Sequence, residues 1–223
     1  MRPVLIGATV LAAIVAILGV LVDQDVRGVL ELDLAVGSAL RFQGAGSSGV
    51  DVLQVLTVPG LSVFRFVVLA PVAVFFAVLG RPRVASFVLL AALTVGPLTT
   101  LLKELVGRVR PTADDPLVAA DGLSFPSGHS SGAATLAGVL LVLLWPLLTS
   151  RWRPWVAAVL TLAALCVAWT RIALGVHYLS DTVGGLALGT AVVLVSMALL
   201  GVYPGGPAQL PEHGWPRLAR KTG

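Results

Sequence analysis

Long runs without a charged side chain constrain this chain more than any other feature. Five such runs occupy residues 4–22, 84–102, 130–150, 154–170 and 182–211, and the last of them stays apolar to about Tyr203. A sixth apolar stretch, 52–80, is interrupted by Arg65, and its span is expected to begin near Gly60. About 20 helical residues cross a hydrocarbon core about 30 Å thick. The sequence therefore predicts six transmembrane helices.

The composition supports the same class. Hydrophobic residues make up 57% of the 223 residues and charged residues only 12%, about half the charged share of a soluble domain. The runs are too long and too evenly apolar for barrel strands, and backbone polar groups in lipid must pair within their own helix. We therefore expect an all-α, polytopic membrane helical bundle. The net charge of +4 forms no basic patch interleaved with aromatic residues, so no nucleic-acid partner is expected.

The domain organisation follows from the spans. Residues 1–203 are expected to form one six-span membrane domain, and residues 204–223 an irregular tail. The first run is interpreted as a signal anchor. Residues 26–41, in the long loop that follows, could form an amphipathic helix at the membrane surface or a plain connector. Gly185 and Gly189 on the last span form a G-x-x-x-G pattern, which predicts close helix packing.

The loops give the orientation. One side carries the N-terminus, two short loops and the tail, and the charged residues of those loops are all basic: Arg81, Arg83, Arg151 and Arg153. Lys and Arg are almost equally frequent on the two sides, but purely basic short loops favour the cytoplasm. We therefore expect a multi-pass protein of the cell membrane with both termini cytoplasmic.

Polar residues concentrate in three clusters on the opposite, extracytoplasmic side. KELVGRVRP (103–111) follows the third span, FPSGHS (125–130) precedes the fourth, and TRIALGVHYLSD (170–181) joins the fifth and sixth. Odd-numbered spans end on this side and even-numbered spans begin there. The topology therefore predicts that the three clusters meet at one membrane face.

The residue types in these clusters suit a bound phosphate. Lys103, Arg110 and Arg171 are three cations, and guanidinium groups match phosphate oxygens bidentately. Ser127 is a good N-cap, and Gly128 lets backbone N–H groups approach an anion at the start of a helix. The same donors would face charge that develops in a transition state.

Two histidines supply the chemistry. His177 and Asp181 are four residues apart, so on a helix the carboxylate can fix the imidazole tautomer and leave the other nitrogen free to attack phosphorus. His129, on another helix, could protonate the leaving oxygen and later activate water. The clusters lack metal-ligand spacing, so no metal or cofactor is expected. Asp114 and Asp115 are interpreted as a solvated turn.

Other polar residues have simpler interpretations. Arg65 is expected to extend to the lipid headgroups, with a supporting role near the cavity as the alternative. Arg108 is interpreted as a solvated or headgroup-facing charge, and His213 as incidental. Cys166, the single cysteine, excludes an internal disulfide and is interpreted as a small buried side chain.

The three clusters together resemble the signature of the type 2 phosphatidic acid phosphatase superfamily. The matching elements are K-x6-R-P at 103–111, P-S-G-H at 126–129 and R-x5-H-x3-D at 171–181. The resemblance implies that His177 becomes phosphorylated, that Asp181 orients it, and that His129 is the general acid. It also implies a metal-independent reaction in which the phosphate is held by Lys103, Arg110, Ser127, Gly128 and Arg171. Thr170 stands where the family usually has Ser, and we expect Thr170 and Pro126 to support the site.

The resemblance implies a membrane lipid phosphatase whose partners are its lipid substrate and the bilayer. A polyprenyl pyrophosphate of the undecaprenyl type is the first choice of substrate, and phosphatidylglycerophosphate or phosphatidate is the alternative. A vanadate-dependent haloperoxidase would use the same cations, but the six apolar spans argue against it. The histidine pair argues against a non-catalytic lipid-phosphate binder or transporter. The sequence does not indicate an oligomeric state.

Overall fold

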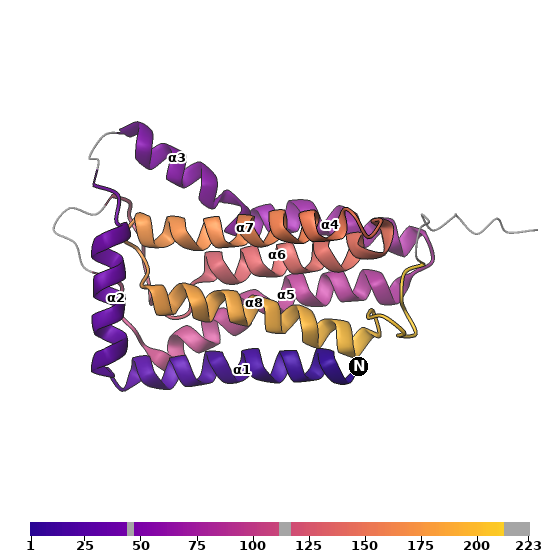
Figure 1. Ribbon diagram of the computed structural model, residues 1–223, viewed down its shortest axis with the longest axis horizontal. Helices are drawn as coiled ribbons and strands as arrows, with labels where there is room; N and C mark the ends of the chain where they lie inside the picture. Colours follow the sequence, from indigo (N-terminus) through magenta and orange to yellow (C-terminus); the bar gives the residue numbers. More distant parts are fainter. Residues whose placement is uncertain (44–46, 112–116, 212–223) are drawn as a thin grey trace, which may run out of the picture.

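The computed structural model describes residues 1–43, 47–111 and 117–211, and it is a bundle of long helices (Figure 1). Six helices run side by side along its long axis: α1 (Arg2–Asp23), α4 (Ser62–Val78), α5 (Pro82–Val106), α6 (Gly128–Leu144), α7 (Arg153–Ala173) and α8 (Leu179–Leu200). The described residues contain no strand. The predicted all-α membrane bundle is confirmed.

The number of membrane spans also agrees with the sequence. Five described helices are long and apolar enough to cross a membrane. Helix α3 (Ser47–Thr57) and the short 3-10 helix η1 (Val58–Gly60) precede α4, and this bent pair makes a sixth span if it is counted as one. The bend is 41°, and it lies at Leu61, between η1 and α4.

Helix α2 (Arg27–Leu40) lies across one end of the bundle, roughly at right angles to the long helices (Figure 1). Of the two interpretations of this segment, the structure therefore has the helix. Its neighbours are α8 and α7. Asp33 is buried toward the bundle at 1% exposure, whereas Leu32 and Leu34 are each 55% exposed. An exposed apolar surface on a helix that crosses the ends of membrane spans is typical of a helix at the membrane surface.

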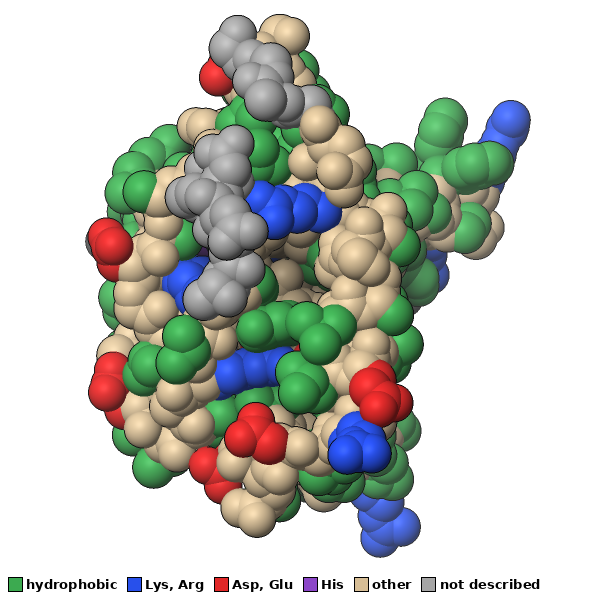
Figure 2. Space-filling view, turned by 90° about the vertical axis from the view of Figure 1, so that its left-hand side faces the viewer, with side chains coloured by type: hydrophobic (Ala, Val, Ile, Leu, Met, Phe, Trp, Pro, Cys, Tyr) green, Lys and Arg blue, Asp and Glu red, His purple; other side chains and the backbone are tan. Residues whose placement is uncertain are grey.

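The start of α8 packs closely against the start of α6. A side chain at Gly185 would collide with the backbone of Ser127, and one at Gly189 with the backbone of Ser131. The predicted role of the G-x-x-x-G pattern in close packing is confirmed. This contact brings the second and third polar clusters together at the end of the bundle beneath α2, where α5 and α7 also end (Figure 1). Figure 2 looks onto this end, and basic side chains lie there among apolar and backbone atoms.

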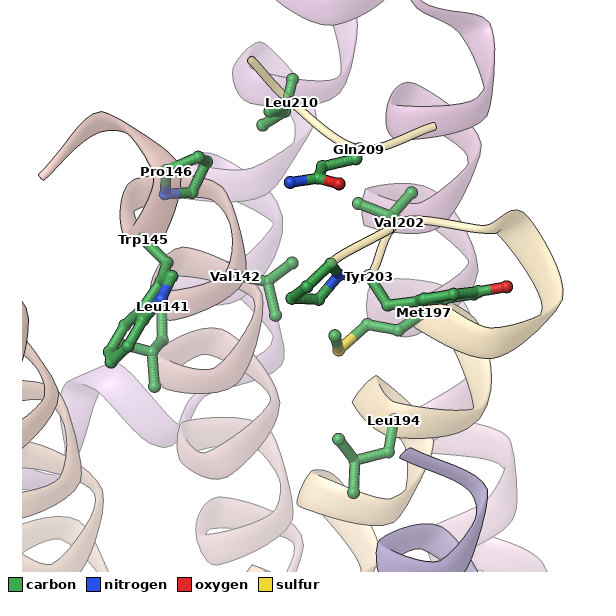
Figure 3. A pocket seen from close by; sticks show the side chains of 11 residues that line it. Leu141, Val142, Trp145, Pro146, Leu194, Met197, Val202, Tyr203, Gln209 and Leu210 are labelled. Atoms are coloured by element: carbon green, nitrogen blue, oxygen red, sulfur yellow. The ribbon is translucent and has the colours of Figure 1, made fainter. Parts of the chain in front are cut away.

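The other end of the bundle, near the N-terminus, holds an apolar cavity of about 430 Å³ (Figure 3). Its walls come from the end of α6, the 3-10 helix η2 (Trp145–Leu147), α8 and the chain that follows α8. The described start of the expected tail, 204–211, is irregular, and Leu210 packs into the core at 4% exposure. His213 lies outside the described residues.

Candidate active site

The structure brings the three polar clusters to one end of the bundle. His177 lies in the turn between α7 and α8 and is 3% exposed. The turn forms because Gly175 adopts a left-handed conformation with φ of +70°, which a glycine reaches without steric cost. The His177 backbone N–H then donates to the Arg171 carbonyl at 3.2 Å. The backbone of His177 is thus tied to the last turn of α7.

Two charged residues contact opposite nitrogens of the His177 ring. Nδ1 lies 3.3 Å from Oδ2 of Asp181, and Nε2 lies 3.0 Å from Nη1 of Arg110. Burial lowers the pKa of His177 to about 4, so the imidazole is neutral at pH 7. A neutral ring that donates from Nδ1 to the carboxylate has its lone pair on Nε2.

The Asp181 carboxylate is completely buried, and both of its oxygens accept hydrogen bonds. Oδ2 accepts from the Tyr178 backbone N–H at 2.9 Å and from the Ser124 hydroxyl. Oδ1 accepts from Nη1 of Arg108 at 2.8 Å. Asp181 is also the third residue of α8, where an acidic side chain caps the helix. The local helix start and the neighbouring loops therefore fix the same carboxylate.

Loop carbonyls hold two of the three predicted phosphate-binding cations. Nζ of Lys103, in the last turn of α5, donates to the Leu123 carbonyl. Arg110 donates from Nη1 to the Val176 carbonyl at 2.8 Å and from Nε to the Gly122 carbonyl at 3.1 Å. Burial lowers the pKa of Arg110 below its usual range. The loop at 120–124 thus orients Lys103 in the last turn of α5 and Arg110 in the connection that follows it.

Arg171, the third cation, lies in the last turn of α7 and is 8% exposed. Its Nη1 lies 3.4 Å from the Thr57 hydroxyl, and its Nε has no acceptor among the residues that the structure describes. A buried guanidinium N–H without an acceptor is uncommon in proteins. A phosphate oxygen is an acceptor that fits this donor.

The first turn of α6 supplies the third part of the cluster. The Ser127 side chain accepts from the Ser130 N–H at 3.4 Å, and the Ser127 N–H donates to the Asp181 carbonyl at 2.9 Å. Gly128 is the first residue of α6. The half-buried His129 follows, close enough to His177 to interact with it electrostatically. Both histidines and the helix start thus lie in one cluster.

The two predicted supporting residues lie behind this cluster. Thr170 is fully buried, and its hydroxyl donates to the Val167 carbonyl at 2.7 Å within α7. The hydroxyl is therefore used by the backbone of its own helix. Pro126 is buried directly before the Ser127 cap. Asp114 and Asp115 lie outside the described residues.

The interpretation of Arg108 as a solvated charge was wrong. Its guanidinium forms salt bridges with Asp33 at 2.7 Å and with Asp181 at 2.8 Å. It also lies over the Tyr178 ring, with 3.9 Å from Cζ to the ring centroid. Asp33 precedes Arg108 by 75 residues, so the sequence pattern around Arg108 contains no sign of this partner.

The expectation that Arg65 extends to the headgroups was also wrong. The side chain is 2% exposed, and its Nε donates to the Ala92 carbonyl at 3.3 Å. The bend at Leu61 turns the first turn of α4 toward α5 and α6. A side chain at Gly132 would lie 2.8 Å from Nη1 of Arg65. Arg65 is thus packed inside the bundle, behind the first turns of α6.

Sequence reasoning missed two residues of the site. The Ser124 hydroxyl donates to Asp181 and lies 3.4 Å from Nδ1 of His177. Asp33 binds Arg108 from α2. An acid inside the apolar run LDLAV is the one signal that could have drawn attention to Asp33, because an acidic side chain there needs a buried partner.

The model of one protein family, described as the PAP2 superfamily, matches residues 83–202, which is more than half of the chain. The chain belongs to the PAP2 superfamily. The matched range contains all three polar clusters. The resemblance on which the sequence analysis relied is therefore confirmed.

Named PAP2 proteins agree with this assignment. The chain is 41% identical over 95 residues to phosphatidylglycerophosphatase B of Bacillus subtilis (strain 168), a match that covers 41% of the chain and 46% of that protein. It is 41% identical over 66 residues to the putative undecaprenyl-diphosphatase YbjG of Escherichia coli (strain K12), covering 30% of the chain and 29% of that protein. The chain thus spans less than half the length of both relatives.

A solved structure extends the similarity to nearly the whole fold. The crystal structure of the first transmembrane PAP2 type phosphatidylglycerolphosphate phosphatase from Bacillus subtilis superposes with a TM-score of 0.73 at 27% identity. The superposition covers 86% of this chain and 94% of that one. The chain is therefore a multi-pass membrane protein with a membrane PAP2 fold.

Proposed function

We propose that this chain is a lipid phosphatase that removes a terminal phosphate from a lipid whose tails remain in the bilayer. One observation carries the proposal. The buried, neutral imidazole of His177 has Asp181 at one nitrogen and Arg110 at the other, at the end of membrane-spanning helices where three cations gather. A phosphate on a lipid headgroup can enter a site at the ends of these helices while the lipid tails stay in the bilayer.

In the first step, the lone pair on Nε2 of His177 attacks phosphorus, and the bond between phosphorus and the lipid oxygen breaks. Protonated His129 gives its proton to that oxygen, so the lipid leaves as an alcohol or as a shorter phosphate. The phosphorylated ring carries positive charge, which Asp181 stabilises. Arg110, 3.0 Å from Nε2 before the reaction, would then donate to a phosphate oxygen.

In the second step, neutral His129 takes a proton from water, and the water oxygen attacks phosphorus. The bond between Nε2 and phosphorus breaks, inorganic phosphate leaves, and both histidines return to their starting protonation states. The negative charge on the phosphoryl oxygens is stabilised in both steps by three cations, Lys103, Arg110 and Arg171. The backbone N–H groups at the start of α6 donate to the same oxygens and stabilise this charge further. No step uses a metal ion.

The relatives are named for different lipid phosphates, lipid A among them. One curated relative is named as a putative undecaprenyl-diphosphatase, and another relative and the solved structure are named for phosphatidylglycerophosphate. We propose a polyprenyl pyrophosphate of the undecaprenyl type or phosphatidylglycerophosphate, with phosphatidate as the next candidate. We also propose that residues 1–203 form the catalytic domain, that its site faces the extracytoplasmic side, and that the termini and the tail at 204–223 are cytoplasmic.

The test is phosphate release by the purified chain from undecaprenyl pyrophosphate, phosphatidylglycerophosphate and phosphatidate, with and without EDTA. We expect release from at least one lipid at a rate that EDTA does not change. His177→Ala should abolish release and the phosphorylated intermediate trapped by quenching in alkaline SDS. His213→Ala, which changes the histidine outside the three motifs, should keep the wild-type rate.

Three results would contradict the proposal. Binding of these lipids without hydrolysis would favour a binder or transporter, and halide oxidation with added vanadate would favour a haloperoxidase. Wild-type turnover by His177→Ala would exclude His177 as the nucleophile. Orientation needs a separate test, in which Asp114→Cys and Arg151→Cys are each labelled in intact cells in a Cys166→Ala background. Only the cysteine at 114 should react.

A further inference from the structure

Helix α2 reaches the reacting groups through Asp33, which lies outside the three motifs, and Arg108, which stands at one of the x positions of the K-x6-R-P motif. Given the proposed phosphatase function, on which this inference rests, we propose that Asp33 and Arg108 are positioning residues for the reaction. They hold the Asp181 carboxylate, and Asp181 in turn holds the His177 ring. The helix at the membrane surface is then a part of the active centre.

Asp33 docks onto the first turn of α8. Its Oδ1 accepts from the Ser180 backbone N–H at 2.8 Å, and its Oδ2 accepts from the Ser180 hydroxyl at 2.6 Å. The first N–H groups of a helix lack partners within the helix, and an acid near them is favourable. Here the acid comes from another helix, so Asp33 fixes the position of α8 relative to α2.

Arg108 connects the two carboxylates. Its Nη2 donates to Asp33 at 2.7 Å, and its Nη1 donates to Asp181 at 2.8 Å and to the Ser180 hydroxyl at 2.7 Å. Burial disfavours the charge, but Asp181 and Asp33 outweigh it and raise the pKa of Arg108. A permanently charged fork between two buried carboxylates allows little rotation of either one.

The geometry separates the role of Arg108 from that of the phosphate-binding cations. Both of its terminal nitrogens point to Asp33, Ser180 and Asp181, whereas Nη1 of Arg110 contacts Nε2 of His177. Arg108 contacts Oδ1 of Asp181, the oxygen opposite the one that faces His177. Loss of Arg108 leaves Oδ1 without this donor, so the carboxylate can rotate away from the ring.

The test compares Arg108→Met and Asp33→Asn with matched changes at exposed positions of α2, Arg27→Met and Glu31→Gln. Dioleoyl phosphatidate in detergent micelles is the first probe, and the lipid of the panel that the wild type hydrolyses fastest is the second. We expect kcat to fall about 10- to 100-fold in both test variants, since a misplacement of about 1 Å costs up to about 100-fold. KM should change less than about threefold, because the phosphate-binding cations are intact. The controls should match the wild type.

A pH profile distinguishes positioning from a general structural role. The charged and titratable groups facing His177 are Asp181, Arg110, Arg171 and His129. Removal of the Arg108 charge leaves the Asp181 anion less compensated and favours the protonated imidazole. The acid limb of kcat/KM should therefore move to higher pH in Arg108→Met. The double variant that combines Arg108→Met with Asp33→Asn should have a kcat only slightly below that of Arg108→Met alone, because both residues act through the Asp181 carboxylate.

Arg108→Lys covers the case in which Arg108→Met does not fold. Lysine keeps the charge but cannot bridge two carboxylates as a fork. The kcat of Arg108→Lys should therefore lie between the kcat of the wild type and that of Arg108→Met. If Arg108→Met does not fold, the kcat of Arg108→Lys should still be clearly below that of the wild type. A folded Arg108→Met or Arg108→Lys with wild-type kcat would overturn the inference, as would a raised KM with an unmoved acid limb. If the wild type hydrolyses no lipid, the proposed function fails instead.

Discussion

Asp181→Asn tests the central feature of the site, a carboxylate that accepts from four groups at once. The change keeps the size of the side chain and replaces one acceptor oxygen by an NH2 donor. Oδ2 faces His177, Tyr178 N–H and Ser124, and Oδ1 faces Arg108 at 2.8 Å. The amide therefore cannot satisfy both sides in either orientation.

Each orientation has a separate cost. If the amide NH2 faces Arg108, two donors oppose each other at 2.8 Å, and a buried guanidinium N–H loses its acceptor, at about 1–3 kcal/mol. If the NH2 faces His177, it donates to Nδ1 and the ring proton moves to Nε2. The nitrogen that should attack phosphorus then has no lone pair. In both cases the phosphorylated ring also loses the neighbouring negative charge.

We expect kcat to fall about 10³- to 10⁴-fold, the size of the loss when an aspartate that holds a catalytic histidine in its tautomer is replaced by asparagine. The assay is phosphate release in detergent micelles, with thermal unfolding of the same samples to confirm the fold. Asp51→Asn, a matched change on the exposed side of α3, should have no effect. A folded Asp181→Asn protein with kcat within tenfold of the wild type would refute the reasoning.

Three further predictions follow from other parts of the fold. Since burial lowers the pKa of His177 to about 4, the acid limb of kcat/KM, corrected for substrate ionisation, should lie near pH 4, and an acid limb near 6.5 would contradict this. Arg65→Ala should lower the free energy of unfolding by about 2 kcal/mol through lost packing and an unpaired carbonyl, whereas the exposed Arg83→Ala should change it little. Gly189→Leu should abolish the folded yield because its side chain meets the backbone of α6. Gly37→Leu, where a side chain meets no atom within 4 Å, should express normally.

The sequence was sufficient to predict the architecture and to predict that the three clusters meet at one end of the bundle. Span lengths follow from the thickness of the bilayer, and the parity of the spans determines at which end each cluster lies. The spacing of His177 and Asp181 predicted a pair on one helix; the two side chains do lie 3.3 Å apart, although His177 stands in the turn before α8 and not on it. These features depend on local sequence and on topology alone.

The environments of two arginines could not be predicted in the same way. Both Arg65 and Arg108 stand near the ends of apolar runs, where arginines usually contact headgroups or water. Their burial depends on tertiary neighbours, namely Asp33 on α2 for Arg108 and the bend at Leu61 for Arg65. Neither the docking of α2 nor the direction of the bend is encoded in a short pattern around the arginine itself.

The donors that meet at Asp181 come from two separate connections: Arg108 and Ser124 lie between α5 and α6, and His177 and Tyr178 lie in the turn between α7 and α8. Under the proposed mechanism, a chain with all its helices inserted but one connection undocked contains every reacting group and still turns over no substrate. The specific activity of a preparation would therefore be proportional to the fraction of molecules in which both connections are docked. It would be a stricter measure of correct biogenesis than helix content or membrane insertion.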